Sequence, residues 1–209
     1  MGPKSIIERA LLGESAEDDA TDRRILDGAL AEVAAQGARR TTVDDVARRA
    51  GVGRVTVFRR MGTKDELLER LFAREVRRFL REVDAALDGV GDPAERVAEA
   101  FVACVRAGVE HPLVSRLARL EPGVALERLA QGSPSPLDLG RAYVAARIEA
   151  DRAGGARPGA THGSAEEIAD VLVRLAVTYV LVPTPVFDVR DEAAARDFAR
   201  RLLAPIVTA

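Results

Sequence analysis

The chain has 209 residues, of which 47% are hydrophobic, 31% charged and 4% aromatic, and its net charge is −2, as is typical of a soluble globular protein. A single cysteine, Cys104, excludes an internal disulfide and a multi-cysteine metal site, and no stretch is apolar for long enough to span a membrane. Residues 1–19 carry charges where a secretory signal needs a continuous apolar region, so we expect a cytoplasmic protein.

Positive charge is concentrated in one segment of the chain. Residues 39–81 carry a net charge of +7, whereas residues 1–38 carry −4 and residues 82–209 carry −5. One basic segment in an otherwise acidic chain is typical of a protein that contacts a polyanion through a single surface. The alternative is that these arginines form a solvated helix face with no ligand.

The composition predicts an all-α fold of nine or ten helices, because Ala and Leu are abundant and runs of β-branched residues are rare. Residues 1–20 are polar and acidic, and we expect them to form a flexible N-terminal arm. The first helix is predicted over residues 21–36, where Ile25, Ala29 and Val33 lie on one face. Gly37 then provides the glycine that commonly ends a helix.

A second helix is predicted to begin at Thr41 or Thr42, because each is followed three residues later by an aspartate in capping-box spacing. Apolar residues within 43–50 follow the i, i+3, i+4, i+7 pattern of a buried helix face. Gly51 ends this helix, and a third is predicted over residues 54–61. Two short helices joined by a glycine turn at this spacing predict a helix-turn-helix.

Thr63 and Glu66 form a further capping box, and the helix that they begin is predicted to continue to about residue 88. We expect a helix-turn-helix DNA-binding domain of residues 21–66, followed by a second helical domain of residues 67–209. Capping residues and prolines predict the remaining helices from 93, over 113–120, 122–130, 135–152 and 164–182, and from 191 to about 205, with a glycine-rich loop over 154–163.

The stretch TTVDDVARRAGVGRVTVFRRMGTKDELL, residues 41–68, resembles the N-terminal domain of the tetracycline-repressor (TetR) family of transcriptional regulators. The resemblance extends from about residue 21 to 72; beyond it, only the number of helices and two apolar C-terminal helices are similar. It implies an all-helical homodimer whose second and third helices read DNA and whose residues 67–209 form a ligand-binding and dimerisation domain. The last two helices would form a four-helix dimer interface, and a pocket in the C-terminal domain would take a small molecule that releases DNA.

The chemistry of the side chains favours the same DNA-binding surface. The start of the second helix offers free N–H groups and two threonine hydroxyls to a phosphate, and the start of the fourth offers a lysine. Arginine can take the O6 and N7 edge of guanine in the major groove, while Arg48 and Arg49 are better placed for the DNA backbone. We predict DNA contacts from Thr41, Thr42, Arg54, Val55, Thr56, Phe58, Arg59, Arg60 and Lys64.

Four positions depart from the family's usual pattern. Gly53 stands where Ser or Thr is usual, so the third helix lacks a side-chain cap. Phe58 replaces a tyrosine whose hydroxyl reaches a phosphate, although its ring can touch a thymine methyl. Arg60 replaces Tyr or His, and Met61 replaces Phe. We therefore expect reading to depend on guanidinium groups rather than on tyrosine hydroxyls.

The C-terminal helices offer weaker candidates. An effector pocket is predicted to be lined by Phe101, Cys104, Val105, Tyr143, Arg147, Arg174 and Thr178, with ordinary core or interface positions as the alternative. Arg174 would anchor an acidic ligand, unless it forms an intersubunit salt bridge or is merely exposed to solvent. The dimer interface is predicted to contain Leu172, Leu175, Tyr179, Phe198 and Leu202.

No Ser-His-Asp, Cys-His or clustered carboxylate arrangement emerges, so we expect no enzyme activity, cofactor or metal. The predicted function is a ligand-responsive repressor that binds a palindromic operator in double-stranded DNA as a homodimer, with an unknown small-molecule effector and no membrane partner. One alternative is a helical small-molecule-binding or enzymatic bundle, which leaves the basic segment unexplained. The other is a DNA-binding activator or architectural factor that takes no ligand.

Overall fold

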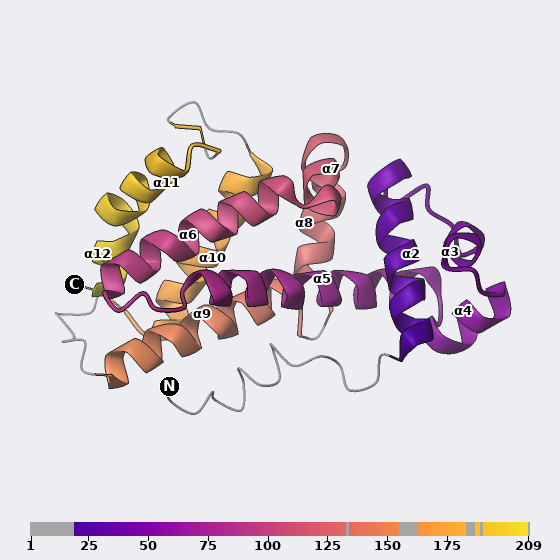
Figure 1. Cartoon of the computed structure of the whole chain (residues 1–209), viewed down its shortest axis with the longest axis horizontal. Coiled ribbons are helices and arrows are strands. Elements are labelled where there is room, and N and C mark those ends of the chain that lie inside the picture. The colour runs from indigo at the N-terminus through magenta and orange to yellow at the C-terminus, as the bar shows by residue number, and fades with distance from the viewer. Residues whose placement is uncertain (1–18, 133, 155–162, 183–186, 189, 209) are drawn as a thin grey trace. The chain divides into compact units, whose positions relative to one another are not determined.

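The computed structural model describes residues 19–132, 134–154, 163–182, 187–188 and 190–208, and all regular elements within these ranges are helices (Figure 1). The predicted all-α fold is confirmed. Most of the predicted N-terminal arm and of the loop over 154–163 lies outside the described residues. The helices are α2 (Ala20–Gln36), α3 (Val43–Ala50), α4 (Arg54–Met61), α5 (Lys64–Ala86), α6 (Pro93–Glu110), α7 (Pro112–Leu120), α8 (Pro122–Ala130), α9 (Pro136–Ala153), α10 (Ala165–Leu181), α11 (Glu192–Phe198), the π-helical turn η1 (Ala199–Leu203) and α12 (Ala204–Thr208).

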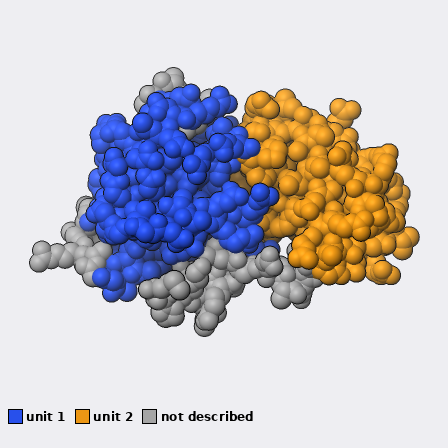
Figure 2. All heavy atoms as spheres, viewed as in Figure 1, with its two compact units in different colours: residues 1–12, 77–110, 137–209 blue, residues 13–76, 111–136 orange. Residues whose placement is uncertain are grey.

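The chain divides into two compact units, which Figure 2 shows in orange and blue. The head unit takes its described residues from 13–76 and 111–136, and therefore contains α2, α3, α4, the first part of α5, α7 and α8. The body unit takes its described residues from 77–110 and 137–209. The functional division predicted at residues 66 and 67 stays a prediction.

The head unit is built on the packing of α2 against α3 and α4. Asp19 caps α2 by accepting hydrogen bonds from the backbone N–H groups of Thr21 and Asp22, at 2.7 and 3.0 Å. The two helices α2 and α3 cross closely at Gly28, where an added Cβ would lie 3.2 Å from the backbone nitrogen of Ala50. A side chain substituted here would require the neighbouring part of α3 to move by a few tenths of an ångström.

The cap of α3 settles where that helix begins. Thr42 is the capping residue: its hydroxyl accepts from the N–H of Asp45, while the Asp45 carboxylate accepts from the N–H of Thr42. Gly51 ends α3 with φ +64°, in the left-handed region that glycine adopts without steric cost. The tight turn between α3 and α4 therefore depends on a glycine at this position.

The body unit has its core between α6, α10, α11 and η1. The ring of Phe101 on α6 packs with those of Tyr179 and Phe198, and the ring of Phe187 packs with the same two, with centroid separations of 4.7 to 5.8 Å among the paired rings. Ala98, Val102 and Val105 complete the α6 side of this core. Among the described residues, no helix is both long and apolar enough to cross a membrane.

The prediction that the last helix ends near Pro205 is wrong, because helical structure continues to Thr208. The turn before the proline widens into η1, where the N–H of Ala204 donates to the carbonyl of Ala199, five residues earlier. Proline lacks an N–H and its ring collides with the carbonyl four residues before it in a regular α-helix. The wider turn lets the chain pass the proline without a break.

Candidate DNA-binding surface

One face of α4 is open to solvent. Arg54, Val55, Phe58 and Arg59 are exposed at the i, i+1, i+4, i+5 spacing of a single helix face, with Val55 77% and Phe58 41% exposed. The opposite face carries Val57 and Met61, which are buried in the head unit. Here the exposed face of α4 means Arg54, Val55, Phe58 and Arg59, and it combines two guanidinium groups with two apolar side chains.

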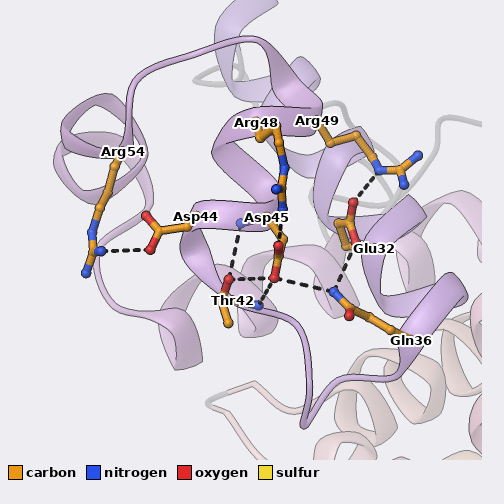
Figure 3. A network of polar contacts seen from close by, with 8 residues as sticks. All are labelled: Glu32, Gln36, Thr42, Asp44, Asp45, Arg48, Arg49 and Arg54. Carbon is orange, nitrogen blue, oxygen red and sulfur yellow. Dashed lines mark hydrogen bonds and ion pairs between the residues drawn. The ribbon is translucent and has the colours of Figure 1, made fainter.

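Arg54 is held between two side chains. Its Nη1 donates to Oδ2 of Asp44 on α3 at 2.8 Å (Figure 3). Its guanidinium carbon lies 5.3 Å from the centre of the Phe58 ring. The second contact is a cation–π interaction. Arg54 is therefore oriented although most of its side chain is exposed.

Arg59 and Arg60 are adjacent in sequence but differ in their surroundings. Arg59 is exposed and makes no hydrogen bond or ion pair with any residue that the structure describes. Arg60 instead donates from Nη1 to Asp19 at 2.6 Å and to Asp22 at 3.0 Å, and hydrogen bonds to these two carboxylates raise its pKa. Arg60 fastens α4 to the start of α2, whereas Arg59 is free to bind a phosphate or a base. The predicted DNA contact of Arg60 stays a prediction.

The two threonines before α3 also differ. Thr41 is 2% exposed, and its hydroxyl donates to the carbonyl of Gly37 at 2.8 Å, so it secures the loop after α2. Thr42 is exposed, and its hydroxyl and N–H both bond to the carboxylate of Asp45. These bonds from Thr42, led by the one from its hydroxyl, lower the pKa of Asp45. The predicted phosphate contacts of both hydroxyls stay predictions.

Asp45 also organises the exposed side of α3, where its carboxylate pairs with Arg48 and lies 3.5 Å from the amide nitrogen of Gln36 (Figure 3). Arg49 donates from Nε to Glu32 on α2 at 2.6 Å. Arg48 and Arg49 remain 76% and 49% exposed at the side chain, so both can approach a phosphate while keeping their carboxylate partners.

Lys64 lies in the first turn of α5, and its Nζ donates to the carbonyl of Arg39 in the loop after α2 at 2.9 Å. Thr63 and Glu66 cap this helix as predicted, with the Glu66 carboxylate 2.7 Å from the N–H of Thr63. Thr56 is half-buried, beside the exposed face of α4. The structure thus places Lys64 next to the helix-turn-helix, near the loop that precedes α3.

Sequence reasoning missed the side chains that fasten the motif from outside. Arg24 of α2 donates from Nη2 to the carbonyls of Ala50 and Gly51, at 2.6 and 3.1 Å, and so closes the end of α3. Arg70 of α5 donates to the carbonyl of Arg60 at 2.7 Å, at the end of α4. A single arginine on a helix gives no sequence signal for a carbonyl 10 or 26 positions away.

The predicted effector-pocket residues are distributed over the body unit. Phe101, Cys104 and Val105 lie on α6, where Phe101 and Val105 are buried in the core, and burial raises the pKa of the Cys104 thiol to about 12. On α9, Tyr143 and Arg147 both bind Asp84 of α5, Tyr143 through its hydroxyl at 3.2 Å.

The remaining two pocket candidates lie on the exposed side of α10. Arg174 pairs with Asp170 at 2.7 Å, and the Thr178 hydroxyl donates to the carbonyl of Arg174. A shallow hollow of about 450 Å³ lies nearby, and none of the seven predicted residues lines it; its lining is Arg141, Glu166, Glu167, Asp170 and Val171.

The predicted dimer-interface residues divide into core and surface positions. Phe198 is 9% exposed within the core of the body unit, and Leu172, Leu175 and Tyr179 pack partly against that core. Leu202 is 53% exposed on the surface. The interface itself stays a prediction. Among the residues described, no cluster of His, Cys, Asp and Glu is suited to hold a metal ion.

Residues 25–71, which include α3, α4 and the start of α5, match the family model described as bacterial regulatory proteins, tetR family. Salmonella enterica GusR has a similar structure, with 19% identity, a TM-score of 0.68, and coverage of 93% of this chain and 99% of that one. The R. erythropolis transcriptional repressor QsdR, from the TetR family, shares 23% identity and a TM-score of 0.61 over 90% of this chain and 96% of that one. At these low identities, the similarity of the structures shows a common fold and nothing more. No curated protein sequence matches the chain.

Proposed function

We propose that this chain, whose DNA-binding domain belongs to the tetR family of bacterial regulatory proteins, is a ligand-responsive repressor that binds a palindromic operator as a homodimer. The observation that carries the proposal is the exposed face of α4. It presents Arg54 and Arg59 beside two apolar side chains on a helix whose other face is buried in a capped helix-turn-helix.

We propose different roles for the predicted DNA-binding residues, and their contacts within the head unit support these roles. Those on the exposed face of α4 enter the major groove, where guanidinium groups bind guanine and apolar groups touch thymine methyls. Arg48, Arg49 and Lys64 bind phosphates. Thr41 and Arg60 act mainly by holding the motif, because their polar groups already have partners within it.

The homodimer and the effector are the finer part of the proposal. The body unit exposes Val171 within α10, Val182 directly after it, Leu202 in η1 and Ile206 on α12, with 37 to 58% of each residue accessible. Burial of these groups between two copies would place two recognition helices on successive major grooves, about 34–36 Å apart along DNA. An effector that binds one dimer shape more tightly would then change the spacing of the heads.

The test is binding of the purified protein to the DNA upstream of its own gene and to a scrambled duplex of equal length, over a series of salt concentrations. We expect tighter binding to the upstream DNA and a steep loss of affinity with salt, because phosphate contacts release counterions. Arg59→Ala should reduce the slope of log affinity against log salt by about 1. Arg119→Ala, which removes an exposed arginine from α7 of the same unit, should leave the slope unchanged.

Equal affinity for the two duplexes, with no effect of Arg59→Ala, would exclude sequence-specific binding through α4. Transcript levels of the adjacent genes separate repression from activation, because deletion of a repressor raises them and deletion of an activator lowers them. The oligomeric state follows from sedimentation of wild type and of Leu202→Glu, which should dissociate a dimer formed through this surface.

A further inference from the structure

We infer that Asp44 is a specificity-determining residue, which holds Arg54 in position to read a guanine in the major groove. The inference rests on the proposed function, because it concerns how the exposed face of α4 discriminates between bases. Asp44 lies in the first turn of α3, where its acidic character alone suggests no contact with DNA.

The position of Arg54 is fixed from two sides. Oδ2 of Asp44 accepts from Nη1 at 2.8 Å, and the Phe58 ring, one helical turn further along α4, lies 5.3 Å below the guanidinium carbon. Figure 3 shows the carboxylate of Asp44 directed from α3 toward the end of the Arg54 side chain. Two contacts from different helices restrict a long side chain that otherwise samples many rotamers.

The contact with Asp44 leaves one edge of the guanidinium group available. Nε and Nη2 of Arg54 have no hydrogen-bond partner among the residues that the structure describes. These two nitrogens donate parallel hydrogen bonds, and the O6 and N7 atoms of guanine accept such a pair in the major groove. Because Asp44 accepts only from Nη1, Arg54 can bind guanine through Nε and Nη2 and keep its hydrogen bond to Asp44.

Stability does not explain the pair. The side chains of Arg54 and Asp44 are both 60% exposed, and an ion pair this accessible to water adds little to the stability of a fold. The cap of α3 is formed by Thr42 and Asp45, so Asp44 is not needed for that purpose either. The contribution of Asp44 is therefore to orient Arg54.

The negative charge of Asp44 also predicts that this residue weakens binding to random DNA. A carboxylate on a DNA-binding surface repels phosphates, so it lowers the affinity for every sequence. When Arg54 binds a guanine, the hydrogen bonds of the oriented guanidinium group compensate for this loss of affinity. With another base these hydrogen bonds do not form, and the loss remains. Asp44 thus raises the ratio of specific to non-specific affinity by weakening the non-specific complex.

The experiment begins with selection of a binding site from a randomised duplex library by the wild-type protein. Affinities are then measured for the selected duplex, for the same duplex with the conserved guanine of each half-site changed to adenine, and for a scrambled duplex. We expect wild type to prefer guanine by about tenfold or more, and Arg54→Ala to lose that preference. Asp44→Asn should retain only a few-fold preference and bind scrambled DNA more tightly, while preferences at other positions persist.

Asp27→Asn is the matched control, because it makes the same change of charge in the head unit. Asp27 also pairs with an arginine, Arg74, at 2.8 Å and is 70% exposed at the side chain, but it lies on α2. We expect the guanine preference of Asp27→Asn to equal that of wild type. Asp44→Glu keeps the charge but moves the carboxylate, and its guanine preference should fall between those of wild type and Asp44→Asn.

A double variant tests whether Asp44 acts through Arg54. In the Arg54→Ala background, Asp44→Asn should cause no further change in the preference at the guanine position. The inference would be overturned if Asp44→Asn kept the full guanine preference. It would also be overturned if Asp44→Asn reduced the preference equally in the wild-type and Arg54→Ala backgrounds. Both outcomes would leave the proposed function intact. If wild type selects no sequence at all, the proposed function fails together with the inference.

Discussion

The carboxylate of Glu121 accepts a hydrogen bond from the backbone N–H of Ala38 at 3.1 Å, across 83 positions of the chain. Glu121 lies between α7 and α8, and Ala38 lies in the loop after α2, so a later segment of the head unit braces the approach to α3. The contact is close: a Cβ added at Gly37, where φ is +90°, would lie 2.6 Å from the same carboxylate oxygen. The helix-turn-helix is therefore supported by residues outside its own sequence.

Glu121→Ala should destabilise the head unit, because the nearly buried Ala38 loses the acceptor for its N–H. A buried donor left without a partner costs about 1–3 kcal/mol, so we expect a loss of about 1–2 kcal/mol in the free energy of unfolding by urea. Glu127→Ala is the control, because the exposed side chain of Glu127 bonds, within the described part of the chain, only to Gln131 directly after α8. An unchanged unfolding midpoint for Glu121→Ala would show that the brace contributes nothing.

A second prediction concerns Glu75, which is 6% exposed in α5. Its carboxylate pairs with Arg74 at 2.7 Å and with Nε2 of His111 at 3.1 Å. Burial acts to raise the pKa of Glu75, but the hydrogen bond from His111 and the charge of Arg74 outweigh it and lower the pKa below 4.5. Glu75→Gln removes the charge from a buried pair, so we expect a loss of about 3 kcal/mol at pH 7.

The pH dependence of the same variant follows from the sign of the shift. A carboxyl whose folded pKa is depressed stabilises the fold above its unfolded pKa of 4.5, and that contribution disappears as the pH falls through the folded pKa. The difference in unfolding free energy between wild type and Glu75→Gln should therefore shrink as the pH falls below about 4.5. A difference that grows in acid would contradict the assigned direction.

Arg60 provides a third prediction, in contrast to Arg59. Arg60→Ala breaks the contacts with Asp19 and Asp22, which join α4 to α2, so we expect its thermal midpoint to fall by a few degrees. Its slope of log affinity against log salt should match that of wild type, because Arg60 already has two carboxylate partners. Arg59→Ala should behave in the opposite way, with a smaller slope and an unchanged midpoint. If Arg60→Ala reduces the slope as well, Arg60 contacts DNA directly.

These differences indicate what the sequence could reveal about the site. Capping residues and helical periodicity act over a few residues, so the helix-turn-helix and the capping box of α5 could be predicted to within one or two positions. The sequence does not show whether Thr41 or Thr42 caps α3, because both have an aspartate three residues later. It depends on the burial of Thr41, which is a property of the packed head unit.

Local sequence patterns do not identify hydrogen-bond partners that are distant in the chain. The position of Arg60 within 54–61 predicts a DNA contact, but the two carboxylates that it binds lie 38 and 41 positions earlier in the chain. Local spacing gives Asp44 only a possible capping role, because its pairing with Arg54 depends on how α3 and α4 cross. The sequence could therefore identify the surface, but not which of its charges are already neutralised.

The final prediction concerns Cys104, the only cysteine, whose thiol reports on opening of the body unit. Burial raises its pKa from 9.0 to about 12, so at pH 8 the reactive thiolate is about a thousandfold scarcer than for an exposed cysteine. We expect a disulfide reagent such as dithionitrobenzoate to label the native protein at least about a hundredfold more slowly than the urea-unfolded protein. Cys104→Ala provides the blank. A native rate close to the unfolded rate would mean that α6 exposes this thiol readily, since reaction through rare opening depends on the population of the open state.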